Sequence, residues 1–292
     1  MIKIEQGYQN KHFRDAGHNI VLMMSVWLLL SSCTNMLLQP METMIRTPAD
    51  IGMEYDDITL SSQGGISLHG WYLPTDKEPL GTVLFFHGNA ENISTHIASV
   101  YWLPSQGYNV FLIDYRGYGR SSGAADIDGV HLDVKAAIEF MIQRKQKGQC
   151  LVVLGQSLGG ALVARTLGDI PYQDIDVVVL DSTFSDYRRI TRDVLDQGLL
   201  TWPVKWPASW LISNRYRPDT VIGNISPTPI LIIHSKKDEV IPLHHALTLY
   251  DNAKEPKELW VLENGGHIAS FVTEKGRYRK KFLDYLKTTC PK

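Results

Sequence analysis

The sequence predicts an α/β fold: a mostly parallel sheet of about eight strands with helices on both faces. Three observations support this prediction. Short, nearly continuous apolar runs recur along the chain, as they do in strands that are buried on both faces. Amphipathic segments with helical spacing lie between these runs. The composition is that of a globular protein, because 44% of the 292 residues are hydrophobic and 21% are charged.

The first 39 residues differ from the rest of the chain. An apolar run of eleven residues, Ile20 to Leu30, follows a polar stretch. It is shorter than the roughly 20 residues of a transmembrane helix and fits the apolar region of a signal peptide. Because the next residues, Ser-Ser-Cys33, resemble the end of a bacterial lipobox, we expect residues 1–32 to be a signal peptide and Cys33 to be lipidated. An uncleaved signal anchor and a buried N-terminal helix are the alternatives.

This interpretation divides the chain into three parts. A signal peptide is followed by a linker over residues 34–56 and by a folded domain over residues 57–290. We expect the protein to be anchored in the membrane through the lipid on Cys33 and to face the periplasm. The alternative signal anchor would attach it through the N-terminal apolar segment instead.

Eight segments of the domain are candidate strands. Residues 58–61 and 66–73 alternate apolar and polar side chains, which indicates strands with one solvent-exposed face and an antiparallel start of the sheet. Six apolar runs are expected to form the parallel part, namely residues 82–86, 109–113, 150–154, 177–180, 230–233 and 259–262. In such a sheet the chemistry takes place at the carboxyl ends of the strands.

Helices are expected between these strands, since apolar side chains recur there at intervals of three and four residues. One pattern runs from Ile93 to Tyr101 and a longer one from Ile127 to Met141. A third runs from Phe271 to Tyr285 near the end of the chain.

A candidate nucleophile follows the strand over residues 150–154. The sequence there reads Gly155-Gln-Ser157-Leu-Gly159-Gly160, and an apolar helix follows. A GxSxG motif between a strand and a helix is the setting of a nucleophile elbow, in which the serine has a strained backbone and neighbouring residues without a Cβ allow close approaches. A plain strand-to-helix turn of small residues is the alternative interpretation.

A nucleophilic serine needs a base and an acid that orients the base. Asp238 follows the strand over 230–233, and His267 follows the strand over 259–262, so both are expected at the same sheet edge as Ser157. We expect His267 to act as general base and Asp238 to hold it in the required tautomer. Asp181, at the end of another strand, is an alternative acid.

From about residue 57 the chain resembles the α/β-hydrolases, in which serine, acid and histidine follow in this order. The motifs are HGNA at 87–90, DYRGYGRSSG at 114–123, GQSLGG at 155–160, LDSTF at 180–184, HSKKDEVIP at 234–242 and GGH at 265–267. Together they look most like the Bem46-like branch of serine hydrolases. That branch includes uncharacterised bacterial members and animal enzymes that remove fatty acyl groups from protein cysteines.

The resemblance also suggests where the oxyanion of the reaction would bind. The backbone N–H of Leu158, just past the nucleophile, is one expected donor. The N–H of Asn89 in the HGNA motif is the expected second donor, with that of Ala90 as the alternative.

Residues 185–219 lie where these hydrolases usually place a cap over the site. The segment contains three of the seven tryptophans, Trp202, Trp206 and Trp210, so these are candidate substrate-binding residues. An apolar cap suits an acyl chain, which is stabilised by burial. The alternatives are a helical layer packed on the sheet and an aromatic surface that rests on the membrane.

Several functions are not expected. The net charge of −2 without any block of basic residues disfavours nucleic-acid binding. No HExxH or CxxC spacing suggests a metal, and no cofactor is expected, because the glycine pattern over 117–123 departs from a dinucleotide fingerprint. Cys150 lies in a strand and Cys290 in the tail, and no disulfide is expected between them.

The sequence therefore predicts a serine hydrolase that acts on a carboxylic ester or thioester in a small-molecule or acylated substrate with an apolar acyl group. A serine peptidase of the same fold is one alternative. A non-catalytic binding module tethered to the membrane is another, and it is disfavoured because no member of the triad is missing. The sequence indicates no oligomeric state.

Overall fold

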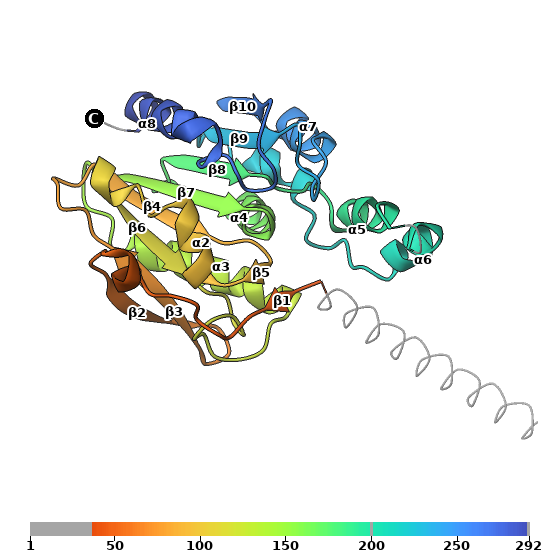
Figure 1. The fold of residues 1–292 in the computed structure, drawn as a ribbon, viewed down its shortest axis with the longest axis horizontal. Coiled ribbons are helices and arrows are strands. Elements are labelled where there is room, and N and C mark those ends of the chain that lie inside the picture. The colour runs from red at the N-terminus through yellow and green to blue at the C-terminus, as the bar shows by residue number, and fades with distance from the viewer. Residues whose placement is uncertain (1–36, 199–200, 291–292) are drawn as a thin grey trace, which may run out of the picture.

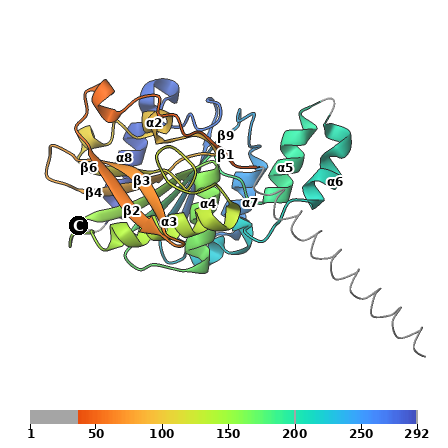
Figure 2. The same ribbon diagram turned by 90° about the horizontal axis from the view of Figure 1, so that it is seen from below.

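The computed structural model describes residues 37–198 and 201–290, in which a twisted eight-stranded sheet lies between helices (Figures 1 and 2). The strands are β2 (Asp56–Ser62), β3 (Ile66–Leu73), β4 (Gly81–Phe86), β6 (Tyr108–Ile113), β7 (Cys150–Gln156), β8 (Val177–Asp181), β9 (Ile230–Ser235) and β10 (Lys257–Leu262). Their order across the sheet is β10-β9-β8-β7-β4-β6-β3-β2. Strand β3 runs antiparallel to β2 and β6, and the other neighbouring pairs are parallel. The predicted α/β fold is confirmed.

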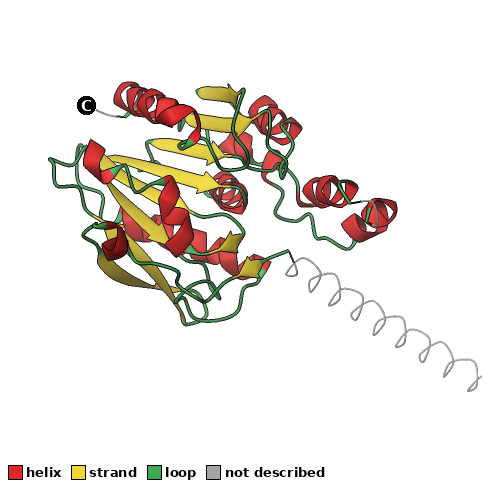
Figure 3. Cartoon of the chain, viewed as in Figure 1, coloured by secondary structure: helices red, strands yellow, loops and turns green. Residues whose placement is uncertain are grey.

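Helices cover both faces of this sheet (Figure 3). The α-helices are α2 (Ile93–His96), α3 (Ile127–Ile142), α4 (Leu158–Asp169), α5 (Tyr187–Asp196), α6 (Lys205–Trp210), α7 (His244–Asn252) and α8 (Arg277–Thr289). Short 3-10 helices lie at Pro48–Ile51, Ile97–Ser99, Pro104–Gln106, Trp202–Val204, Pro218–Thr220, Ile222–Asn224 and Thr273–Gly276. The expected helix from Ile93 is thus divided into an α-helical turn and a 3-10 turn.

The central strands supply two hydrophobic cores, because alternate side chains of a strand point to opposite faces of the sheet. Leu84 and Phe86 of β4 belong to the core that includes side chains of α3, α4 and α7. Val83 and Phe85 belong to the other core, which includes side chains of α2 and α8. The sheet is therefore buried on both faces. The loops that follow its parallel strands lie at the carboxyl ends of those strands, along one edge of the sheet.

The segment before the sheet is packed on the domain, which corrects the expected linker over 34–56. We call residues 37–47 the strap. Its short strand β1 (Gln39–Pro40) pairs with β5 (Ala90–Glu91), and Leu38 is buried in a core. The side chain of Asn92 donates hydrogen bonds to the carbonyl groups of Met41 and Thr43, both at 2.9 Å. Apolar burial and side-chain amides hold the strap in place.

The predicted signal peptide over residues 1–32 and the lipidation site Cys33 lie outside the described residues. Within residues 37–198 and 201–290, no helix has both the length and the apolar character that a bilayer crossing requires.

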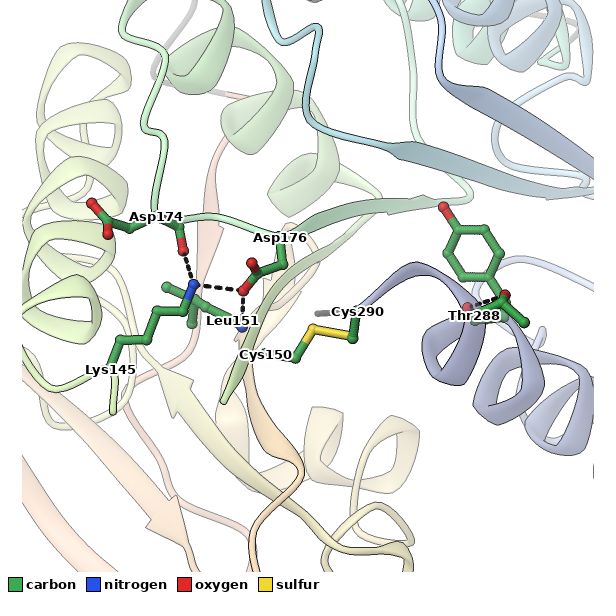
Figure 4. Close-up of a disulfide and its surroundings, with 8 residues drawn as sticks. Lys145, Cys150, Leu151, Asp174, Asp176, Thr288 and Cys290 are labelled. Carbon is green, nitrogen blue, oxygen red and sulfur yellow. Dashed lines mark hydrogen bonds and ion pairs between the residues drawn. A yellow bond between two sulfur atoms is a disulfide. The ribbon is translucent and has the colours of Figure 1, made fainter. Parts of the chain in front are cut away.

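Cys150 and Cys290 form a disulfide, contrary to the expectation that they would not pair (Figure 4). Cys150 is the first residue of β7, and Cys290 directly follows α8. Because Phe282 and Leu286 of α8 are buried in the core on the same face, the end of the helix returns to the start of β7. The two Cα atoms are 5.5 Å apart, a usual separation for a disulfide.

Candidate active site

Ser157 lies at the sharp turn between β7 and α4 and has a strained backbone. Its φ of 54° and ψ of −117° are unusual for a residue other than glycine. Hydrogen bonds hold this conformation: the Ser157 N–H donates to the carbonyl of Asp181 at 2.9 Å, and the Thr183 hydroxyl donates to the carbonyl of Ser157. The turn therefore presents the serine hydroxyl at the carboxyl edge of the sheet.

The glycines around Ser157 permit contacts that no side chain allows. A Cβ on Gly155 would lie 2.6 Å from the backbone of Gly159, and one on Gly159 would lie 2.3 Å from the carbonyl oxygen of Phe86. A Cβ on Gly160 would meet Thr183 Oγ1 at 2.1 Å. The motif thus has the close packing that a nucleophile elbow requires.

Ser157, His267 and Asp238 form one hydrogen-bonded chain. Nε2 of His267 lies 3.0 Å from Ser157 Oγ, and its Nδ1 lies 2.9 Å from Asp238 Oδ2. The other carboxylate oxygen of Asp238 accepts hydrogen bonds from the N–H groups of Val240 at 2.9 Å and Ile241 at 2.8 Å. The loops that follow β7, β9 and β10 bring together three residues that are up to 110 positions apart in sequence.

The electrostatics around Asp238 fix the tautomer of His267. Burial by itself would raise the pKa of Asp238, but the hydrogen bond from His267, the nearby imidazole and the N–H of Ile241 hold it below its ordinary value. The carboxylate is therefore an anion at neutral pH. It accepts a hydrogen bond from Nδ1 of His267, so the proton of the neutral imidazole is on Nδ1. The lone pair of Nε2 then faces Ser157 Oγ, as a general base requires.

Asp181, the alternative acid, has other partners. It is fully buried, and its two carboxylate oxygens accept hydrogen bonds from Gln156 Nε2 at 2.7 Å and Ser270 Oγ at 2.6 Å. Burial raises its pKa. Since Asp238 makes the contact with His267, the geometry favours Asp238 as the acid of the triad.

The two expected oxyanion donors lie beside the serine. Leu158 is the first residue of α4, where backbone N–H groups have no acceptor within the helix. The loop after β4 lies against Ser157, because a Cβ on Gly88 would be 3.5 Å from the Cβ of Ser157. Asn89 and Leu158 line the same cavity as Ser157. The alternative donor, Ala90, belongs to β5 and pairs with Gln39.

The side chain of Asn89 connects this loop to the strap, a contact that the sequence did not predict. Its Nδ2 donates to the carbonyl of Leu37, and its Oδ1 accepts from the N–H of Gln39 at 3.1 Å. The hydroxyl of Tyr118 donates to the same oxygen at 3.2 Å. The strap therefore supports the backbone that carries the expected oxyanion donor.

A largely apolar cavity of about 500 Å³ opens beside Ser157 and His267. One wall comes from the strap through Leu37 and Leu38, and another comes from one side of α5. Its apolar lining otherwise consists of Ala90, Ile127, Leu158, Phe184, Tyr187, Ile190, Val194, Leu195, Val240, Ile241 and Ile268. Polar side chains at the cavity include Gln39, Glu91, His96 and Thr191. The wall on α5 lies in the segment in which a cap was expected.

Trp206 and Trp210 do not line this cavity, which corrects their assignment as substrate-binding residues. They lie on α6 and are 54% and 64% exposed, whereas Ser209 of the same helix is buried. Helix α6 thus turns its small residue inward and its tryptophans outward, and the aliphatic residues of α5 supply the wall. The side chain of Trp202, the third candidate, lies outside the described residues.

Asp193 on α5 and His244 and His245 on α7 are the one group among the described residues whose ligand atoms are close enough for a metal ion. Their hydrogen bonds do not suit a metal. The Ser185 N–H donates to Nδ1 of His245 at 3.1 Å, so the proton of a neutral imidazole is on Nε2, 2.9 Å from Asp193 Oδ2. The group instead ties α5 to α7.

A family model described as serine aminopeptidase, S33, matches residues 77–226. The chain is 36% identical over 238 residues to the uncharacterized protein YfhR of Escherichia coli K12, covering 79% of this chain and 80% of that protein. It is 29% identical over 211 residues to protein bem46 of Schizosaccharomyces pombe, covering 70% and 68% of the two chains.

Among solved structures, the chain resembles the esterase Pf2001 of Pyrococcus furiosus. The TM-score is 0.72 at 21% sequence identity, and the match covers 87% of this chain and 98% of the esterase. This likeness supports the fold.

Proposed function

Since the chain belongs to the serine aminopeptidase S33 family of α/β-hydrolases and to its Bem46-like branch, we propose that it hydrolyses carboxylic esters or thioesters with an apolar acyl group. The observation that carries this proposal is the position of the triad. His267 hydrogen-bonds to Ser157 and Asp238 at the wall of an apolar cavity.

In the first step, Nε2 of His267 takes the proton of Ser157 Oγ as the oxygen attacks the acyl carbon. Asp238 stabilises the imidazolium that forms. The N–H groups of Leu158 and Asn89 hydrogen-bond to the oxyanion. The intermediate then collapses: the bond to the alcohol or thiol breaks, the leaving group takes the proton from His267, and an acyl-Ser157 ester remains.

Water completes the cycle. His267 takes a proton from a water molecule, the hydroxide attacks the acyl-enzyme ester, and the carboxylic acid leaves as Ser157 regains its proton. The apolar cavity favours the longer acyl groups that fit, because each buried methylene contributes about 0.8 kcal/mol. Activity should therefore rise with chain length until the cavity is filled.

The test is a series of p-nitrophenyl esters of increasing acyl length with the full chain, together with a fluorophosphonate label. We expect turnover and labelling in the parent protein and in Ser61→Ala, a surface control, and neither in Ser157→Ala. A folded parent protein that turns over and labels no better than Ser157→Ala would contradict the proposal and favour a binding module.

A peptidase is the second candidate, favoured by the position of Glu91. This exposed carboxylate lines the cavity, where it would attract the amino group of a peptide. Aminoacyl p-nitroanilides separate the two functions. Turnover of these amides that is lost in Glu91→Gln, with ester turnover unchanged in that variant, would replace the esterase proposal.

We further propose that the protein is anchored in the membrane and faces the periplasm, with Cys33 lipidated. The disulfide between Cys150 and Cys290 supports this location, because disulfides persist in oxidising compartments. Metabolic labelling with a fatty acid should mark the parent protein and not Cys33→Ala. Equal labelling of the two would favour the alternative signal anchor.

A further inference from the structure

The outer side of the cap carries an apolar surface, which we call the cap face and define as Val204, Trp206, Trp210 and Leu211. These side chains are between 48% and 64% exposed. Three other tryptophans differ, since Trp71, Trp102 and Trp260 are at most 7% exposed. Exposed apolar patches of this kind mark a surface that meets a partner.

The chemistry of the cap face suits a lipid interface. Trp206 and Trp210 are four residues apart on α6 and so point to the same side. The guanidinium of Arg192 lies 4.9 Å from the ring centre of Trp206. Tryptophan is enriched where a bilayer meets water, and cationic side chains there meet lipid phosphates.

The chain that precedes the strap restricts where a bilayer lies. Only four residue steps separate Cys33, the proposed site of lipidation, from Leu37, which lines the cavity. They span at most about 14 Å. Both views of the ribbon show α5 and α6 on the same side of the molecule as β1 of the strap (Figures 1 and 2). A lipid on Cys33 therefore keeps the membrane close to the strap and to the cap.

Helix α5 connects the cavity with the cap face. Val194 of α5 lines the cavity and is 48% exposed, so its side chain lies at the rim. Arg192, on the same helix, contacts Trp206 of the cap face. Helix α5 thus contacts the cavity through Val194 and the cap face through Arg192.

We propose that the cap face docks on the surface of a phospholipid bilayer and places the cavity where it receives acyl groups from membrane-embedded substrates. The docking itself goes beyond the proposed hydrolysis. Its use for membrane substrates rests on that proposed function.

The first test measures docking without any turnover. Full-chain Trp27→Phe protein, in which the tryptophan of the apolar run is removed, is reconstituted into phosphatidylethanolamine–phosphatidylglycerol vesicles with or without brominated acyl chains. We expect brominated lipid to quench its fluorescence and most of this quenching to vanish in Trp27→Phe/Trp206→Phe/Trp210→Phe. Trp260→Phe in the same background is the control for a buried tryptophan and should keep the quenching. No quenching in the parent, or quenching that survives removal of both cap tryptophans, would overturn the docking.

The second test measures turnover. Trp206→Ser/Trp210→Ser is expected to lose at least about fivefold in the hydrolysis of a long-chain thioester embedded in vesicles, while a water-soluble short ester is turned over as before. Leu247→Ser, at an exposed apolar site on α7, should change neither rate. An equal loss on both substrates, or no loss on either, would overturn the proposal. So would a dimer in light scattering that these substitutions dissociate, because the face would then be a subunit interface.

The two tests separate the failure of docking from the failure of the proposed hydrolysis. An inactive parent protein whose cap tryptophans are quenched keeps the docking and removes the hydrolase. An active protein whose cap tryptophans are not quenched keeps the proposed hydrolysis and removes the docking.

Discussion

The strap and helix α5 of the cap wall the same cavity, but the strap and the cap are attached to the domain in different ways. The strap buries Leu38, and its backbone receives hydrogen bonds from the side chains of Asn89 and Asn92. The cap buries Tyr187 in the core, is tied to α7 through Asp193, and leaves Trp206 and Trp210 exposed. From this difference we propose separate roles: the strap holds the backbone that carries the expected oxyanion donor, and the cap shapes the cavity for the acyl group.

The largest effect should come from cutting the link between the strap and residues 87–90, which we call the oxyanion loop. In Asn89→Ala the backbone N–H remains, but the hydrogen bonds to Leu37 and Gln39 are lost. Because the N–H donor is no longer held in place, we expect kcat to fall about tenfold to a hundredfold for every acyl length. Steady-state kinetics across the ester series measures this.

Tyr118→Phe is the matched control, since it removes one donor to Asn89 and keeps the hydrogen bonds of Asn89 to Leu37 and Gln39. Its kcat should fall by no more than about threefold. If Asn89→Ala lowers only the melting temperature and leaves kcat unchanged, the strap is a stabilising element and the contrast with the cap disappears.

One buried histidine under each wall should make the free energy of unfolding depend on pH. Burial and the neighbouring His87 lower the pKa of His96, under the oxyanion loop, to about 4. Burial, His244 and Arg189 lower that of His245, under the cap, to about 3. The unfolded histidines take up protons as the pH falls through about 6.5, whereas the folded ones do not, so stability is full above that pH and is lost below it.

Each histidine should therefore cost about 2 kcal/mol of unfolding free energy between pH 8 and pH 5. Urea unfolding at the two pH values measures the loss, and His96→Gln and His245→Gln should each reduce it by about that amount. An unchanged pH dependence in either variant would mean that the corresponding imidazole takes up its proton in the folded protein.

The smallest effect is expected from a change of size in the cap wall. Ile190→Trp on α5 fills part of the cavity, so the preferred acyl chain should become shorter by a few carbons. The kcat/KM for the shortest ester should stay within about twofold. Chain-length profiles of Ile190→Trp and Trp210→Ser, which lies outside the cavity, make the comparison. A shift in the profile of Trp210→Ser and none in that of Ile190→Trp would contradict the prediction, because α6 and not α5 would then set the preferred chain length.

The sequence predicted the strands of the sheet and the positions of the triad residues well, because both depend on local sequence patterns. Each apolar run became a strand, and Ser157, Asp238 and His267 follow strands whose carboxyl ends share one edge. Strand and motif together therefore placed the triad before any contact was known.

The parts that were wrong depend on contacts between distant segments. The strap looked like a linker, because its partners, β5 and the side chains of Asn89 and Asn92, lie about 50 residues away in the sequence. Cys150 looked like an ordinary buried residue, since nothing local shows that α8 brings Cys290 beside it. Trp206 and Trp210 are apolar, and composition alone does not tell which side of α6 faces outward.

The disulfide has a consequence for proteolysis. Cys150 and Cys290 close a loop that contains Ser157, Asp238 and His267, together with the whole cap. A protease that cuts the exposed cap would therefore produce two fragments, one with the nucleophile and one with its acid and base, that remain joined through sulfur. A nicked protein keeps all its catalytic groups in one covalent molecule until a reductant separates them.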